Sequence, residues 1–270
     1  MLALEDVRLV YNPGGSGEVR ALRGVSLEIP AGQFVTVVGS NGAGKSSLMK
    51  VVAGEERPSS GRVRLAGRDV TRLPVHRRAG LVARVFDDPR AGTLPELSIE
   101  DNMALALCRG RRRTLRFASG RARRTLMRER LAVLGLGLER RVGDPAGLLS
   151  AGQRQSLTMV MAGLRDPRLL LLDEHLAALD PATQQRVLEL TTSLVRRLGC
   201  ATLMVTHNME HAIGVGDRLL VMSQGQVVAD LAGEEKAALT PERLVETIVA
   251  AGDAVSDRLL LRETAAAGAG

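Results

Sequence analysis

Aromatic side chains are scarce in this chain of 270 residues. It has no Trp, one Tyr and three Phe, and these make up 1% of the sequence. Large rings usually supply much of the buried area in a core, so the core here must be aliphatic. Each aromatic residue can therefore be considered individually.

Cysteines and long apolar runs are also few. Cys108 and Cys200 lie far apart, with no C-x-x-C pair and no His cluster. We expect both to be reduced, buried residues of a cytosolic protein. No apolar run approaches the roughly 20 residues that cross a bilayer, and the N-terminus lacks the apolar region of a signal peptide. We therefore expect a protein that is neither secreted nor integral to a membrane.

Positive charge is in excess. The net charge is +7, and 45% of the residues are hydrophobic. The length allows one large domain, or a core with a subdomain. The charge suggests an acidic partner, such as a nucleotide, nucleic acid or a membrane surface.

The clearest motif is a glycine loop between an expected strand, Phe34–Val38, and an expected helix, 47–54. This context is typical of a phosphate-binding loop, in which glycines let successive N–H groups face one anion at a helix N-terminus. Lys45 would reach the β- and γ-phosphates, and the Ser46 hydroxyl would ligate Mg²⁺. The loop comprises Gly39, Ser40, Asn41, Gly42, Ala43, Gly44, Lys45, Ser46 and Ser47.

Two further buried strands are expected to end in polar groups. Leu169–Leu172 is followed by Asp173 and Glu174, and 200–206 is followed by His207. Ligands of parallel α/β sheets bind at the carboxyl ends of the strands. Asp173 would hold Mg²⁺, directly or through water, and Glu174 would act as general base toward an attacking water.

A second anion site is expected where Ser150 precedes a helix. A serine there caps the helix, and the exposed N–H groups of the first turn attract anions. The segment from Arg109 to Arg130, which precedes Ser150 in the sequence, holds ten arginines and one acid, Glu129. That run is a solvated helix face with a connector, a contact for anionic lipid headgroups, or a nucleic-acid contact with only Phe117 available for stacking.

Together these motifs resemble the nucleotide-binding subunit of ATP-binding cassette (ABC) transporters, over residues 2 to 250. Gly39 to Ser47 matches the Walker A loop and Leu169 to Glu174 matches Walker B. Leu149 to Gln153 matches the signature motif, with Ser150, Ala151, Gly152 and Gln153 as nucleotide contacts and Ala151 replacing the usual glycine. Asp180 falls in the D-loop, and His207 matches the switch histidine. Tyr11, otherwise a core-packing residue at a strand end, matches the aromatic that stacks on adenine.

The resemblance implies a P-loop NTPase (RecA-like) α/β fold. A parallel-sheet core, about 2–86 and 165–250, would carry an N-terminal antiparallel β subdomain. An inserted α-helical subdomain would span about 87–164, and 251–270 would be a C-terminal tail, of which we expect Ala265–Gly270 to be disordered. One residue departs from the family: Asp87 stands where the Q-loop glutamine contacts Mg²⁺ and the attacking water. Aspartate can ligate a metal, but it is shorter and adds charge beside the triphosphate.

The resemblance also implies partners. Two copies would meet head to tail around two ATP molecules, bound with Mg²⁺, and act on a separate membrane permease. Finer similarity to tryptophan/tyrosine uptake systems suggests import of an amino acid or similar solute, with an extracytoplasmic substrate-binding protein, from the cytoplasmic side of the membrane. A soluble ABC ATPase with a regulatory or mechanical role is the alternative, although the chain lacks a second cassette. A phosphoryl-transfer kinase would not explain the signature motif.

Overall fold

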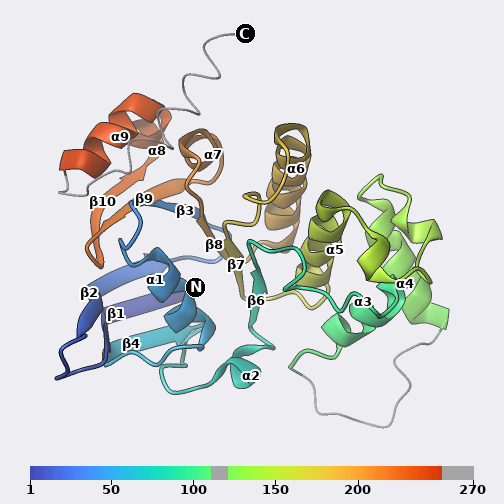
Figure 1. Cartoon of the computed structure of the whole chain (residues 1–270), viewed down its shortest axis with the longest axis horizontal. Coiled ribbons are helices and arrows are strands. Elements are labelled where there is room, and N and C mark those ends of the chain that lie inside the picture. The colour runs from blue at the N-terminus through green and yellow to red at the C-terminus, as the bar shows by residue number, and fades with distance from the viewer. Residues whose placement is uncertain (111–120, 251–270) are drawn as a thin grey trace.

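The computed structural model describes residues 1–110 and 121–250. The expected tail 251–270 and the middle of the arginine-rich run, 111–120, lie outside the described residues. Two sheets and a group of helices make up the described part (Figure 1).

The smaller sheet has four strands in the order β2-β1-β4-β5. They are β1 (Leu2–Tyr11), β2 (Val19–Ile29), β4 (Ser60–Leu65) and β5 (Arg68–Asp69). All neighbours are antiparallel, as expected for the N-terminal β subdomain. The alternating burial along β4 shows one face on the core and one in solvent.

The larger sheet has six strands in the order β10-β9-β3-β8-β7-β6. They are β3 (Phe34–Val38), β6 (Val82–Val85), β7 (Leu169–Asp173), β8 (Ala201–Val205), β9 (Arg218–Ser223) and β10 (Gln226–Ala232). All neighbours are parallel except β10, which forms a hairpin with β9. β3 and β8 are buried at every residue, because helices cover both faces of the parallel strands. This α/β arrangement confirms the predicted fold class.

Two separate cores cover the two faces of the parallel sheet. α1 (Lys45–Ala53) packs on one face, with Leu169 and Leu171 of β7. The alternate residues, Leu170 and Leu172, face a second core that includes residues of α5 (Ala151–Gly163) and α6 (Pro181–Leu198). Since side chains alternate along a strand, Asp173 follows Leu169 and Leu171 toward the α1 face.

The helices α3 (Ile99–Leu107), α4 (Arg121–Ala132) and α5 share a further apolar core with the 3₁₀ turns Leu138–Arg140 and Ala146–Leu148. Figure 1 shows this group at one end of the molecule, far from the antiparallel sheet. The remaining helices are α2 (Val75–Arg78), α7 (Met209–Gly214), α8 (Gly233–Ala237) and α9 (Pro241–Ala250). No helix within 1–110 and 121–250 combines the length and apolarity needed to cross a membrane.

Several local expectations can be compared with the structure. Ser98 before the acidic residues Glu100 and Asp101 predicts a helix N-cap, and Ser98 does cap α3, because its hydroxyl accepts a hydrogen bond from Asp101 N at 3.0 Å. The sequence over 79–86 predicts a strand, but the strand in the structure spans only Val82–Val85, because the chain turns before Val82. The expectation that both cysteines are buried is wrong for Cys108, which is exposed where it ends α3 on the surface. In the arginine-rich run, Arg124 pairs with Glu100 at 2.6 Å, so this arginine already has a partner within the chain.

Candidate nucleotide-binding site

The phosphate loop connects the end of β3 to the start of α1, and two of its glycines have conformations that exclude a side chain. Gly39 has φ 150°, and a Cβ there would lie 2.2 Å from the backbone oxygen of Met222. Gly44 has φ 99°, and a Cβ there would lie 2.7 Å from the oxygen of Ala21. Glycine is required at both positions, because the loop approaches other backbone closely and adopts positive φ. The loop leads directly into the N-terminus of α1, which suits an anion.

The Lys45 ammonium lies over this loop. Its Nζ donates to the carbonyl oxygens of Gly39 at 2.6 Å and Ser40 at 2.8 Å, and the residue is 8% exposed. A cation beside a helix N-terminus makes the loop strongly attractive to phosphate.

A pocket of about 560 Å³ opens on the loop. Asn41, Gly42, Ala43, Gly44, Lys45, Ser46 and Ser47 line it. Tyr11 lines the same pocket, as does Glu174. Tyr11 is held there because β1 pairs with β2, where Tyr11 faces Val19. The structure therefore brings the predicted aromatic, lysine, serine and carboxylate to one cavity of nucleotide-binding size.

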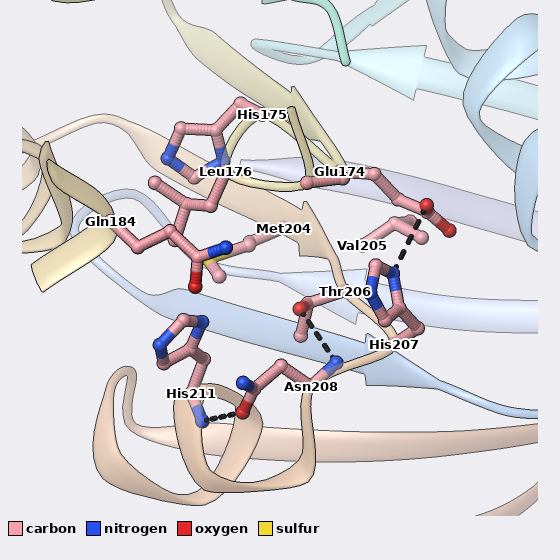
Figure 2. A pocket seen from close by; sticks show the side chains of 11 residues that line it. Glu174, His175, Leu176, Gln184, Met204, Val205, Thr206, His207, Asn208 and His211 are labelled. Carbon is pink, nitrogen blue, oxygen red and sulfur yellow. Dashed lines mark hydrogen bonds and ion pairs between the residues drawn. The ribbon is translucent and has the colours of Figure 1, made fainter. Parts of the chain in front are cut away.

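Glu174 and His207 meet at the carboxyl edge of the sheet. His207 Nδ1 lies 3.2 Å from Glu174 Oε2, and a dashed line marks this contact in Figure 2. The hydrogen bond to His207 is the main cause that lowers the pKa of the Glu174 carboxyl, and burial opposes it. Lys45 lowers this pKa further through its charge. Glu174 is therefore ionised at neutral pH and oriented toward the pocket.

The backbone of Glu174 is unusual. Its φ is +46°, and its N–H donates to Val205 O of the neighbouring strand at 3.0 Å. Left-handed conformations cost non-glycine residues energy and cluster at functional sites. Here the bond to β8 holds the chain in this turn, directly after Asp173.

Asp173 pairs with an arginine that the sequence analysis did not single out. Arg84 of β6 donates to Asp173 Oδ2 at 2.5 Å and also pairs with Glu55, just beyond α1. Burial alone would lower the pKa of the Arg84 guanidinium, but the bonds to Glu55 and Asp173 raise it. A charged residue inside the apolar run 82–85 was the only hint in the sequence.

Asp87 is not brought to the pocket. It follows β6, is exposed, and does not line the cavity around the phosphate loop. The adjacent backbone is anchored, because Phe86 O accepts a hydrogen bond from Gln155 Nε2 at 3.0 Å. The predicted contact of Asp87 with a metal therefore stays a prediction.

The Ser150 region, predicted to be a second anion site, is a capped helix N-terminus. Ser150 caps α5 by accepting from Gln153 N at 3.3 Å, while Gln153 Oε1 accepts from Ser150 N at 3.1 Å. This capping box fixes the first turn, which contains Ala151 and Gly152. None of Ser150, Ala151, Gly152 and Gln153 lines the pocket of the phosphate loop.

Asp180 begins the neighbouring helix. It caps α6, accepting from Thr183 N at 3.1 Å, and its bonds to Thr183 lower the pKa of its carboxyl. A Cβ at Gly152 would lie 2.4 Å from Thr183 Cγ2, so the starts of α5 and α6 are close together. The capped start of α5 thus lies outside the pocket of the phosphate loop, and Asp180 lies close to it.

Gln155 joins three predicted motifs: the helix after Ser150, on which it lies, the segment before Asp87 and the segment after Glu174. Sequence reasoning missed this residue. It is 0% exposed, and its Nε2 donates to Phe86 O and, at 2.6 Å, to His175 O. One side chain of α5 thus ties the segment before Asp87 to the segment after Glu174. The sequence offered only a weak hint, a glutamine at a position that the helix buries.

His175, whose carbonyl accepts the bond from Gln155, is also a buried polar residue. Its Nε2 lies 3.0 Å from Thr191 Oγ1, and that hydroxyl donates to Val187 O at 2.8 Å. Because the hydroxyl proton is committed to the carbonyl, His175 Nε2 carries the proton of this pair. Burial, with a smaller effect from His211, lowers the pKa of His175 to about 3, so the ring is neutral and fixes this loop to α6.

Comparison with known proteins agrees with this geometry. The family model described as ABC transporter matches residues 22–177. The tyrosine transport ATP-binding protein of Clostridioides difficile is 40% identical over 235 residues, 87% of this chain and 93% of that protein. An aliphatic sulfonates import ATP-binding protein of Agrobacterium fabrum is 35% identical, covering 80% of this chain and 76% of its own length.

Solved structures agree as well. A dimeric, post-hydrolysis ATP-binding cassette bound to ADP and Pi has a TM-score of 0.73 and 27% identity, covering 86% of this chain and 98% of the other. The phosphate loop, the acidic strand end and the capped helix at Ser150 thus occur in the fold that this family shares. The chain belongs to the ABC transporter family as an ATP-binding subunit, and it is an ATPase of the kind coupled to transport.

Proposed function

We propose that this ATPase is the energy-coupling subunit of an importer for an amino acid or a similar small solute. The support is the similarity to a tyrosine transport protein over most of both chains. The subunit would bind at the cytoplasmic side of the membrane to a separate permease, and an extracytoplasmic substrate-binding protein would deliver the solute. The segment from Asp87 to Leu97 would face the permease, as part of a helical subdomain of about 87–164 set on a core of 2–86 and 165–250.

The nucleotide binds in the pocket on the phosphate loop. The N–H groups of residues 39–47 and the Lys45 ammonium hold the phosphates, and the Tyr11 ring stacks on the adenine. This assignment rests on the shared pocket of Tyr11, Lys45 and the loop. Lys45 exchanges its bonds to the loop carbonyls for the β- and γ-phosphates when ATP enters.

The donor set fits Mg²⁺. The Ser46 hydroxyl lines the pocket, and Asp173 lies on the sheet face that α1 covers. Hydroxyl and carboxylate oxygens are the ligands Mg²⁺ prefers, with several waters retained. When bound, the ion neutralises charge on the β- and γ-phosphates. Asp87 would approach the ion only if its loop moved, and its extra negative charge would then slow turnover.

Hydrolysis uses Glu174 and His207. The ionised Glu174 carboxylate accepts a proton from the attacking water, and His207 orients the carboxylate through its Nδ1. The observation that carries this proposal is the 3.2 Å pair at the edge of the cavity that Lys45 also lines. A general base of this kind contributes about 10²–10⁴-fold to a rate.

The second half of each site comes from another copy of the chain. Ser150, Ala151, Gly152 and Gln153 present a capped helix N-terminus away from the pocket, so they can bind the γ-phosphate held by a partner molecule. Asp180, beside this turn, would lie at the same junction. ATP then closes the dimer, and loss of the γ-phosphate opens it.

Size-exclusion chromatography of Glu174→Gln tests the dimer. With saturating ATP and Mg²⁺ this variant should elute as a dimer, because it binds ATP but cannot hydrolyse it. Glu210→Gln, an exposed change on α7, is the matched control and should behave as wild type. A Glu174→Gln chain that stays monomeric would contradict the head-to-tail model. Copurification with a multi-helix membrane protein would separate the transport role from a soluble regulatory one.

A further inference from the structure

Arg84, Glu55 and Asp173 form a charge cluster at the carboxyl end of β7. Arg84 pairs with both carboxylates, and its guanidinium carbon lies 4.8 Å from the centre of the Phe86 ring. The side chains of Arg84 and Asp173 are only 13% and 16% exposed. Charged pairs in such sites are screened little and hold defined geometry.

The fold explains why the arginine reaches this place. Ala83 and Val85 of β6 point into the core on the α5 side of the sheet. Alternation along the strand therefore directs Arg84 to the opposite face, where α1 packs. α1 ends at Ala53, and its C-cap Gly54, with a positive φ of 86°, turns the chain away from the helix just before Glu55. The cluster thus links the end of the phosphate-loop helix to the end of β7.

The charges of the cluster do not cancel. One guanidinium faces two carboxylates, so the cluster keeps a net negative charge that a further cation can share. Arg84 bonds to Oδ2 of Asp173, which leaves Oδ1 as the oxygen for a metal ion or its bound water. Carboxylates that ligate metals are themselves held by hydrogen bonds, and loss of such a partner typically lowers metal affinity about 10–100-fold.

We propose that Arg84 is a positioning residue for the magnesium site. Arg84 holds Asp173 by Oδ2 and thereby directs Oδ1 toward the ion. The proposal rests on the role of Asp173 given above. Glu55 anchors Arg84 from the other side, so that the guanidinium stays in place when the ion arrives. The alternative is that Arg84 competes with Mg²⁺ for Asp173, in which case its loss would strengthen Mg²⁺-dependent binding.

The test is the dissociation constant of AMP-PNP, measured by calorimetry with Mg²⁺ and again with EDTA. Arg84→Met should reduce the Mg²⁺-dependent gain in affinity about 10–100-fold and leave the EDTA value unchanged. A defect that is only structural would weaken both values alike. Arg64→Met is the matched control, since Arg64 pairs with Glu5 on the exposed surface at 3.3 Å.

Two further variants keep the test decisive. If Arg84→Met does not fold, Arg84→Lys replaces it in the test. Arg84→Lys retains the positive charge but cannot bond to both carboxylates in the same geometry, so it should show a smaller loss of the Mg²⁺-dependent gain in affinity. Asp173→Asn should abolish the Mg²⁺-dependent gain. If Asp173→Asn leaves the gain intact, the metal role of Asp173 fails. If Asp173→Asn removes the gain while Arg84→Met keeps or increases it, only the proposal for Arg84 is overturned.

Discussion

Replacing Gln155 with methionine removes the side chain that joins α5 to the two segments beside Asp87 and Glu174. Methionine has a similar length and helix propensity but no N–H donor. The carbonyls of Phe86 and His175 would each lose the bond from Nε2. An unsatisfied buried acceptor costs about 1–3 kcal/mol, so the loss of both bonds should lower the free energy of unfolding by about 2–6 kcal/mol. That is a large share of the roughly 5–15 kcal/mol of a typical domain.

Urea denaturation followed by circular dichroism measures this change. Gln185→Met is the control, because Gln185 is an exposed glutamine on α6. Its side chain donates to the exposed side chain of Glu189 at 3.0 Å, at the surface of the protein. The control should stay within about 0.5 kcal/mol of wild type. A Gln155→Met protein as stable as the control would refute the reasoning, because the two buried bonds would then contribute nothing.

Further predictions concern the loop and the catalytic groups. Gly42→Ala should cost about 1–2 kcal/mol in urea unfolding, the price of positive φ, since a Cβ there meets nothing within 4 Å. Gly44→Ala should cost about 1–3 kcal/mol more because its Cβ would lie 2.7 Å from a backbone oxygen; equal losses would contradict this. Asp87→Gln should raise the ATPase rate, and no change in hydrolysis or transport would count against the proposed role. In His207→Ala the pKa of Glu174 should rise toward its ordinary value, because the bond that lowers it is lost. Carboxyl NMR of nucleotide-free protein, with Glu174→Gln for assignment, should show titration at higher pH; an unchanged midpoint would refute it.

Local patterns in the sequence determined the phosphate loop, the expected strand ends and the helix caps. These patterns are the spacing of the glycines, the apolar β-rich runs and a serine three residues before a glutamine. Each involves residues close together in the sequence, so the local geometry that it predicts follows from short-range rules. The expected Ser150 cap and the strand that ends at Asp173 are therefore present where the sequence indicated. The structure also places Glu174 beside His207, 33 positions along the chain, because adjacent parallel strands end at one edge.

Only the tertiary structure decided the contacts of Arg84, Gln155 and His175. Arg84 meets Asp173 across 89 positions, and Gln155 meets Phe86 across 69. Such pairs depend on which strands adjoin and which face of a helix turns inward, and no local pattern specifies either. For the same reason the burial of Cys108 was predicted wrongly and the exposed place of Asp87 was not foreseen. The sequence alone named the groups that we propose to contact the nucleotide, whereas the packing of distant segments decided what holds those groups in position.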